Sequence, residues 1–342
     1  MADIPTLFAR QVADCRDLGS PFTARVLEKV LALIDRQSAL SRRILLSDAR
    51  PEDALPLRLA GALHALARAG DADLAAVYPP HQATDAALAK ALARALTGAE
   101  TEILPWLDHP PQTNEVARSA VLIATGHWLT ARFGLPLVLS ELGASAGVNL
   151  RWDHYALDLP GLRLGPEDAA LTLTPDWRGE LPPSAAPQVL DRAGVDLAPL
   201  DPVGDRKRLL AFIWADQTIR LQRCAAALDL AARKDVRVAQ GDAAAWAEAR
   251  LANPQPNAMH LIFHTIAAKY FSDATTRRLQ SALAKAGAAA TLKNPLAHLA
   301  MEWDGPTPGA ALTLTLWPGG QKIALGRADF HGRWVDWQAP AP

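Results

Sequence analysis

Residues 137–150, LVLSELGASAGVNL, constrain the fold of this chain more than any other stretch. An apolar run begins at Leu137 and stops at Glu141, which is typical of a short, buried parallel strand. Small residues follow, among them Gly143 and Gly147, and they allow the backbone to turn tightly. Amphipathic sequence then resumes, so we expect a strand, a glycine turn and the N-terminus of a helix. Parallel α/β sheets build nucleotide sites in this way.

The spacing of this turn differs from the three-glycine fingerprint of dinucleotide-binding proteins. An acid at the strand end, followed by Gly-x-x-x-Gly-x-Asn, resembles the first motif of class I S-adenosylmethionine-dependent methyltransferases. The resemblance implies that the turn passes beside the methionine part of the cofactor, with Glu141 near its amino group. The cofactor-binding residues it implies here are Glu141, Gly143, Ala144, Ser145, Gly147 and Asn149. A tight turn that holds no ligand is the alternative interpretation.

Composition limits the classes of protein to which the chain can belong. Its 342 residues suffice for one large or two ordinary domains, and 50% are hydrophobic and 21% charged, which excludes wholesale disorder. The 35 basic and 36 acidic residues give no argument for nucleic acid or an anionic membrane as a partner. No apolar run approaches the ~20 residues of a membrane span, and we expect a cytoplasmic protein.

A metal site is not expected from the cysteines. The sequence has two, Cys15 and Cys224, which are far apart and lack any Cys/His ligand spacing.

Two domains are predicted. Apolar residues recur at three- and four-residue spacing in the first 110 residues, so we expect a helical N-terminal domain or cap over 1–110. Residues 111–342 show the alternation of an α/β domain. Within it, 156–187 is rich in proline, glycine and aspartate and is interpreted as a β-ribbon insertion.

The pattern after the glycine turn predicts a doubly wound, Rossmann-like sheet, and the methyltransferase resemblance implies that it is of the class I methyltransferase type. A helix over 117–133 leads into the first strand, and helical segments separate the later ones. The further strands are expected at 189–197, 235–243, 257–263 and 288–292, and a closing hairpin at 311–317 and 322–330.

Two further strand ends carry acids. Asp196 lies where nucleotide-binding α/β folds place a carboxylate that accepts hydrogen bonds from ribose, although its separation from Gly147 exceeds the usual ~20 residues. Asp191 and Asp201 are the fallback candidates. The methyltransferase resemblance implies that the Gly241-Asp242 pair places its acid beside the adenine amino group. A turn followed by an N-capped helix explains Asp242 equally.

Polar residues that precede the helix over 117–133 are also candidates. Gln112 and Asn114 could face the glycine turn and contact cofactor or substrate, or simply cap that helix.

Two residues are candidates for catalysis. His264 follows the 257–263 strand and could act as a general base, or it could be structural. Asp153, in the stretch Trp152-Asp-His-Tyr155, is either catalytic or an anchor for the insertion.

Taken as a whole, the chain resembles the bacterial proteins of unknown function grouped as DUF2332. The resemblance carries no activity with it. The segments that carry it are Gln112–Val116, Glu141–Leu150 with Trp152-Asp153, Gly194–Leu197, Trp214–Gln217, Gly241-Asp242, Phe263-His264 and His331–Trp334.

We therefore expect an S-adenosylmethionine-dependent methyltransferase that acts on an unidentified small-molecule acceptor. The sequence shows no recognisable acceptor motif, which favours the alternative of a similar fold that binds a nucleotide or metabolite without methyl transfer. A hydrolase that uses Ser145 is a second alternative, because Gly143–Gly147 fits the G-x-S-x-G pattern. For a hydrolase, the sequence lacks an evident acid that would orient the histidine, and it lacks the glycines of an oxyanion hole. The oligomeric state is not indicated.

Overall fold

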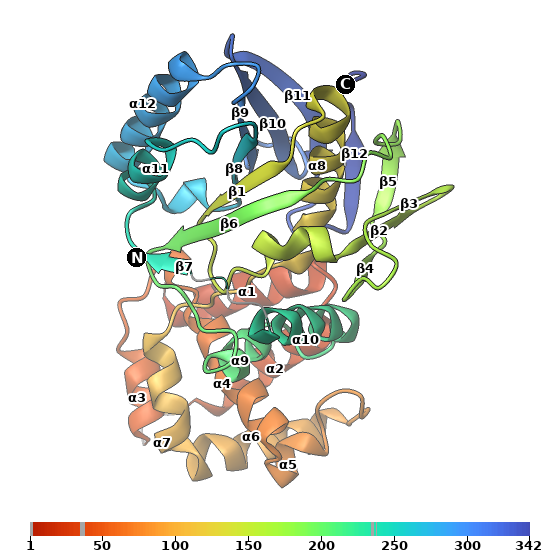
Figure 1. Cartoon of the computed structure of the whole chain (residues 1–342). Helices are drawn as coiled ribbons and strands as arrows, with labels where there is room; N and C mark the ends of the chain where they lie inside the picture. Colours follow the sequence, from red (N-terminus) through yellow and green to blue (C-terminus); the bar gives the residue numbers. More distant parts are fainter. Residues whose placement is uncertain (1–2, 35–37, 234–235, 237) are drawn as a thin grey trace. The chain divides into compact units, whose positions relative to one another are not determined.

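The computed structural model describes residues 3–34, 38–233, 236 and 238–342 (Figure 1). They form two compact units, each described by itself below. The helical unit comprises Met1–Thr113 and Gly204–Ala225, and the α/β unit comprises Asn114–Val203 and Ala226–Pro342. In the part of the chain that is described, no helix has both the length and the apolar character needed to cross a bilayer.

The helical unit confirms the N-terminal helical region. Several helices begin at a side chain that caps the first backbone amides: Asp3 accepts from the N–H of Thr6, and Thr84 from that of Ala87. The helices are α1 (Ile4–Asp17), α2 (Pro21–Leu33), α3 (Ala39–Leu45), α4 (Leu55–Ala69), α5 (Ala72–Ala75), α6 (Asp85–Gly98), α7 (Glu100–Ile103) and α9 (Arg206–Ala211), with the short 3₁₀ turns η1 (Pro51–Asp53) and η2 (Leu104–Asp108).

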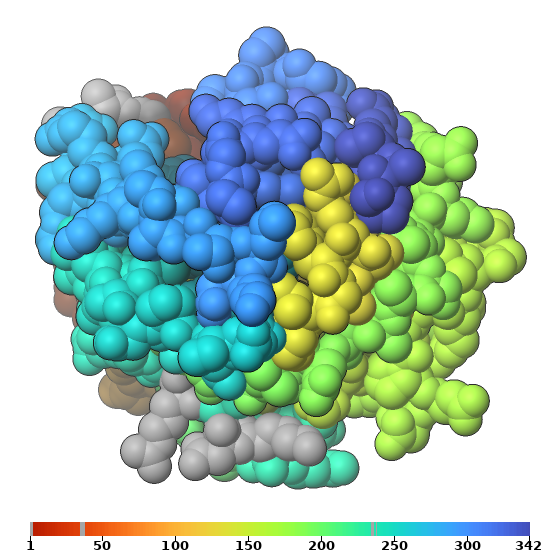
Figure 2. All heavy atoms as spheres, turned by 45° about the horizontal axis from the view of Figure 1, so that its top comes forward, coloured from red at the N-terminus to blue at the C-terminus, as the bar shows by residue number. Residues whose placement is uncertain are grey.

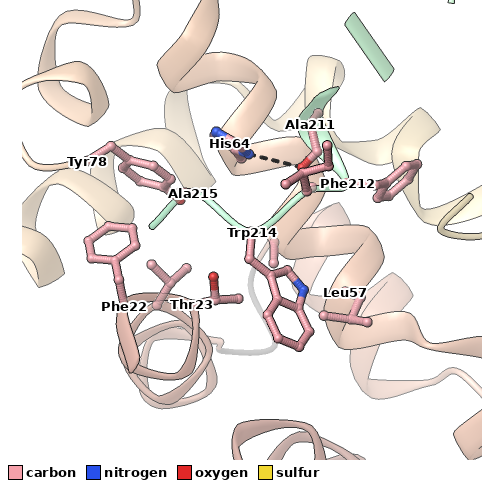
Figure 3. Close-up of a pocket in the computed structure, with 13 residues that line it drawn as sticks. Phe22, Thr23, Leu57, His64, Tyr78, Ala211, Phe212, Trp214 and Ala215 are labelled. Carbon is pink, nitrogen blue, oxygen red and sulfur yellow. Dashed lines mark hydrogen bonds between the residues drawn. The ribbon is translucent and has the colours of Figure 1, made fainter. Parts of the chain in front are cut away.

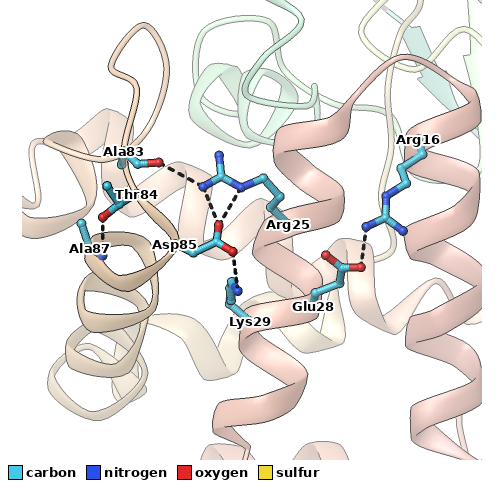
Figure 4. A network of polar contacts seen from close by, with 8 residues as sticks. All are labelled: Arg16, Arg25, Glu28, Lys29, Ala83, Thr84, Asp85 and Ala87. Carbon is cyan, nitrogen blue, oxygen red and sulfur yellow. Dashed lines mark hydrogen bonds and ion pairs between the residues drawn. The ribbon is translucent and has the colours of Figure 1, made fainter.

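Ion pairs join helices on the surface of this unit (Figure 4). Asp85, at the start of α6, lies 2.8 Å from the guanidinium of Arg25 and 2.8 Å from the ammonium of Lys29, both on α2. Arg16 of α1 contacts Glu28 of α2 at 2.6 Å. Beneath them the helices bury a leucine-rich core that includes fully enclosed side chains such as Leu59. The core stabilises the unit, since exposed pairs contribute little.

Residues 204–225 were counted with the α/β domain in the sequence interpretation, but they pack within the helical unit. They hold α9 and the first half of α10 (Thr218–Arg233).

The α/β unit is built on a mixed, largely parallel sheet of nine strands within the described residues, which confirms the α/β class. The strand order is β5-β12-β11-β10-β9-β8-β1-β6-β7. The strands are β1 (Leu137–Leu142), β5 (Asp176–Gly179), β6 (Val189–Asp196), β7 (Val238–Gln240), β8 (Met259–Thr265), β9 (Leu296–Glu302), β10 (Ala310–Trp317), β11 (Gln321–Ala328) and β12 (Trp334–Trp337).

The order of the parallel strands reverses at β1. β6 and then β7 follow on one side of it, whereas β8 and then β9 follow on the other, all of them parallel. All six residues of β1 are buried, which explains the continuous apolar run in the sequence. Ligands of open α/β sheets bind outside the carboxyl ends of the strands at such a reversal.

Helices cover both faces of this sheet (Figure 1). α11 (Ala243–Leu251) and α12 (Asp273–Ala289) pack on one face, where Leu142, Val195 and Ile262 join their apolar side chains. α8 (Ser119–Phe133), preceded by the 3₁₀ turn η3 (Val116–Arg118), lies on the opposite face. Alternate side chains of β1 and β8 therefore reach different helices.

The closing hairpin of β10 and β11 is present close to its predicted range, but the predicted fifth strand was misplaced. Residues 288–289 still belong to α12, and β9 begins at Leu296 after a turn that contains Asn294 and Pro295. β7 is shorter than the strand expected at 235–243, in which Asp235 and Arg237 lie outside the described residues.

The predicted insertion contains β2 (Ala156–Leu159), β3 (Leu162–Leu164) and β4 (Thr172–Leu173), which form a small separate sheet. β5 leaves it and pairs with β12 at the edge of the main sheet. On one face of the α/β unit, the yellow segment around the end of α8 lies between the C-terminal strands in blue and the insertion in green (Figure 2). Stretches far apart in the sequence thus share one surface.

Candidate functional site

The glycine turn follows β1 at the carboxyl edge of the sheet, where the strand order reverses. Three of its residues have left-handed backbone angles: Gly143 with φ +75°, Ser145 with φ +51° and Gly147 with φ +67°. Gly143 is also sterically required, because a Cβ built on it would lie 2.6 Å from the Cβ of Ala267. The turn leads into the short 3₁₀ helix η4 (Asn149–His154) and not into the expected α-helix.

The backbone amides of this turn are bound by the protein itself. The N–H groups of Ala146 and Val148 donate to Oδ1 of Asn114 at 3.1 and 3.3 Å. The N–H of Ser145 donates to Asp196 Oδ2 at 2.8 Å. Those of Gly143, Ala144 and Gly147 donate to backbone carbonyls. A phosphate would need such amides free, so the turn is not built as a phosphate cradle.

Glu141 is the most unusual residue of the site. Its side chain is buried, the residue being 1% exposed, and its Oε2 atom is enclosed without a hydrogen-bond partner among the described residues. Burial raises the pKa of this carboxyl well above its ordinary value, and the charge of Asp196 raises it further. The charges of Arg118 and Arg151 oppose the rise but do not cancel it. Buried carboxylates are normally paired, so an enclosed Glu141 oxygen without a partner among the described residues is unusual.

The two arginines near Glu141 are held by backbone carbonyl groups. Arg118, at the end of η3, donates to the carbonyls of Phe330 and Thr265 at 2.8 and 3.1 Å. Arg151 of η4 donates to the carbonyl of Gly147 at 2.6 Å. They lower the electrostatic cost of a carboxylate at Glu141 and also fix the loops around the strand ends.

Asn149 and Asp196 lie in the same group. Asn149 donates to the carbonyl of Glu115 at 3.3 Å and accepts from the hydroxyl of Ser119 at 2.8 Å. Asp196, at the end of β6, accepts from the N–H of Ser145 and, at 2.9 Å, from the N–H of Ala198. The structure thus brings Glu141, the turn, Asn114, Asn149 and Asp196 together.

Asp242 and Gly241 follow β7. Asp242 caps α11 by accepting from the N–H of Ala245 at 2.9 Å, and its pKa is lowered chiefly by a hydrogen bond from the hydroxyl of Thr275. Gly241 precedes it and donates to the backbone carbonyl of Asp196 at 3.0 Å. Gln112 belongs to the helical unit.

Asp153 is engaged beside the middle of β6. Its carboxylate forms a bidentate pair with Arg192, with an Nη2–Oδ2 distance of 2.8 Å. Arg192 is opposite Leu139 in the register of β1 and β6, so Asp153 lies away from the carboxyl edge.

His264 reaches the carboxyl edge from the other face of the sheet. Glu141 is opposite Phe263 in the register of β1 and β8, so His264 shares a face with Leu142 and not with Glu141. Its Nδ1 lies 2.6 Å from Oε1 of Glu302, and its ring is 5.1 Å from that of His298.

Four of these polar residues were missed by the sequence analysis: Arg118, Arg151, His298 and Glu302. A strand assigned at 296–302 would have shown His298 and Glu302 at even spacing on one face, with Glu302 at the carboxyl end. Nothing local in the sequence marks the two arginines.

A hollow of about 580 Å³ adjoins the turn. Its walls are Ala146, residues 199–203, the end of α10 at 231–233, Val236 and Val238. Its volume is in the range of small-molecule sites.

The helical unit also has a hollow, of about 20 Å³ (Figure 3). Tyr78 and His64 line it, and the Tyr78 hydroxyl is enclosed without a partner in the described part of the chain. The space suits a single water molecule and not an organic ligand.

Comparison with known proteins gives one result. A family model described as "Uncharacterized protein conserved in bacteria (DUF2332)" matches residues 6–337. The chain belongs to the DUF2332 family. No curated protein and no solved structure matches this DUF2332 chain. The family resemblance in the sequence is thereby confirmed.

Proposed function

We propose that this DUF2332 protein binds S-adenosylmethionine at the carboxyl edge of the sheet and is a methyltransferase for a small-molecule acceptor. The observation that carries the proposal is Glu141, a buried acid near the end of β1 with an oxygen that has no hydrogen-bond partner among the described residues. An ammonium group would supply the missing partner. The amino group of S-adenosylmethionine is such a group, and when bound this cofactor supplies an activated methyl group.

The distribution of hydrogen bonds favours a cationic ligand over a phosphate. The amides of the turn are engaged by Asn114, Asp196 and backbone carbonyls. The carboxyl group of Glu141 has an enclosed oxygen without a hydrogen-bond partner among the described residues. The amides that would bind phosphate oxygens are therefore occupied, which argues against a dinucleotide or a nucleoside triphosphate as the ligand.

Binding should be coupled to proton release from Glu141. Its raised pKa favours the protonated carboxyl in the free protein, and an adjacent ammonium favours the carboxylate. Affinity should therefore increase with pH until Glu141 is ionised in the free protein. Ser145, Asn149 and the hollow beside Ala146 would surround the rest of the ligand.

Calorimetric titration with S-adenosylmethionine and S-adenosylhomocysteine tests the proposal. We expect saturable binding whose apparent enthalpy depends on the ionisation enthalpy of the buffer, because a proton is released. Glu141→Gln preserves the shape of the side chain and should weaken binding at least about tenfold. Glu167→Gln, at an exposed position, is the matched control. Undiminished affinity in Glu141→Gln would remove the basis of the proposal.

A second candidate is a ligand-binding protein that transfers no methyl group. Both oxygens of Asp196 accept backbone amides, which leaves less capacity for ribose recognition than a methyltransferase would need. Binding of amines or nucleotides in place of S-adenosylmethionine would favour this candidate.

The hydrolase alternative has less support. The oxyanion donor would be the N–H of Ala146, and that group is bound to Asn114.

A further inference from the structure

A second polar cluster lies at the carboxyl edge, formed by His264 of β8 with His298 and Glu302 of β9. The strands are parallel with His264 opposite Ala300, so the three side chains share one face of the sheet. His264 is 5% exposed. Its Nδ1 is 2.6 Å from Glu302 Oε1, and its ring packs near those of His298 and Phe271.

Glu302 determines which nitrogen of His264 carries a proton. Its Oε1 also accepts the N–H groups of Ala267 and Ala268 at 2.9 and 3.1 Å. Burial alone would raise the pKa of Glu302, but the hydrogen bond from His264 and those two amides hold it below the ordinary value. An ionised carboxylate can only accept hydrogen bonds, so Nδ1 of His264 must be the protonated nitrogen. The lone pair of the neutral ring is then on Nε2.

The environment of Nε2 leaves it available. Among the described residues Nε2 of His264 makes no hydrogen bond, and it is not enclosed as Nε2 of His298 is. The groups that face His264 are the carboxylate of Glu302 and the imidazole of His298, both from β9, and the apolar ring of Phe271. Burial lowers the pKa of His298 to about 3, so at neutral pH it brings no charge.

We propose that Glu302 is a positioning residue that holds His264 as the Nδ1–H tautomer, so that Nε2 accepts a proton from a substrate over the ends of β8 and β9. This rests on the proposed function and specifies its acceptor as an alcohol, a phenol or an amine with a proton to lose. The O–H or N–H bond of the acceptor breaks, and its electron pair stays on the oxygen or nitrogen. The proton goes to Nε2, and the Glu302 carboxylate stabilises the resulting imidazolium.

The tautomer can be measured directly by nitrogen NMR of the full chain labelled with ¹⁵N-histidine. The chain has nine histidines, and the variant His264→Gln identifies the signals of this one by their loss. In the neutral ring we expect a protonated Nδ1 and an unprotonated Nε2. Glu302→Ala removes the oxygen that accepts the hydrogen bond from Nδ1 and should give a mixture of the two His264 tautomers. Glu302→Gln, whose amide oxygen can accept the same three N–H groups, should retain the wild-type tautomer and guards against a folding defect.

Two results overturn the positioning role: a wild-type His264 protonated on Nε2, or a Glu302→Ala variant with the wild-type tautomer. S-adenosylmethionine affinity separates this inference from the proposed function. If Glu302 acts only on the methyl acceptor, the Glu302→Ala variant should bind S-adenosylmethionine within about twofold of the wild-type affinity. Glu141→Gln should instead reduce that affinity. If the wild-type chain binds no S-adenosylmethionine, the acceptor assignment is overturned, and the tautomer measurement alone decides the role of Glu302.

Discussion

Replacement of Glu141 by glutamine should stabilise the protein at neutral and alkaline pH while it impairs ligand binding. Glu141 is fully enclosed, and its pKa in the folded state is raised well above the ordinary 4.5. The folded state therefore binds this proton more tightly than the unfolded state does. The contribution of Glu141 to the free energy of unfolding is greatest below about pH 4.5 and falls as pH rises through the folded-state pKa. Above that pKa the carboxyl is ionised in both states, and its contribution no longer changes with pH.

The size of the effect follows from the cost of the buried charge. Each unit by which the pKa is raised corresponds to about 1.4 kcal/mol once the group is ionised. An unsatisfied buried polar group costs about 1–3 kcal/mol, and a charged one more. Glutamine leaves a polar group in place but no charge. We therefore expect Glu141→Gln to match the wild type near pH 4.5 and to exceed it by about 1–3 kcal/mol at pH 9.

The assay is thermal unfolding of both proteins as a function of pH, without ligand. For a unit of this size the difference corresponds to about 2–4 °C per kcal/mol. Glu167→Gln, an exposed replacement of the same kind, should leave the midpoint unchanged at every pH. A Glu141→Gln variant that is no more stable than the wild type at pH 9 would show that the carboxylate is compensated in the folded protein. The reasoning that leads to an ammonium ligand would then fail.

Three further variants test the structure around the site. Gly143→Ala should lower the free energy of unfolding in urea by about 1–3 kcal/mol, because the new Cβ would lie 2.6 Å from that of Ala267. The control Gly134→Ala has a similar backbone angle, φ +63°, but open space around it, and should lower the free energy of unfolding less. Asp242→Ala removes the cap of α11 and should cost about 1 kcal/mol, with little effect on S-adenosylmethionine affinity if Asp242 is only a cap. Burial lowers the pKa of His298 to about 3, so the folded protein loses stability as pH falls from 6.5 toward 3. His298→Leu should remove about 3 kcal/mol of that loss at pH 4. A variant whose stability falls with decreasing pH as steeply as that of the wild type would contradict this prediction.

Much of the architecture was readable from local sequence. The buried strand at Leu137–Leu142, the helical N-terminal region and the closing hairpin each depend on periodicity and turn residues, which are local properties. The strand at Leu296–Glu302 was missed, since its apolar residues alternate with His298 and Glu302 and the alanine-rich end of α12 precedes it. The family was also recognisable from short motifs.

The candidate site was predictable from the sequence only in part. The acids at the ends of β1 and β6 were predicted as candidates, and the structure places Glu141 and Asp196 near one another. Whether an acid is engaged or left unpartnered was not predictable. Asp153 and Asp242 have hydrogen-bonded partners supplied by Arg192 and Thr275, which are distant in sequence.

The sequence by itself determined the strand and the sharp turn through the small residues at positions 143–147, because backbone conformation depends on residues that are neighbours in the sequence. Only the tertiary structure decided that Asn114 and Asp196 accept hydrogen bonds from amides of that turn, and that Oε2 of Glu141 has no partner in the part of the chain that is described. It likewise decided that Glu302 is the partner of His264, 38 residues away. Burial and hydrogen bonding between distant segments set charge states, and no local pattern encodes them.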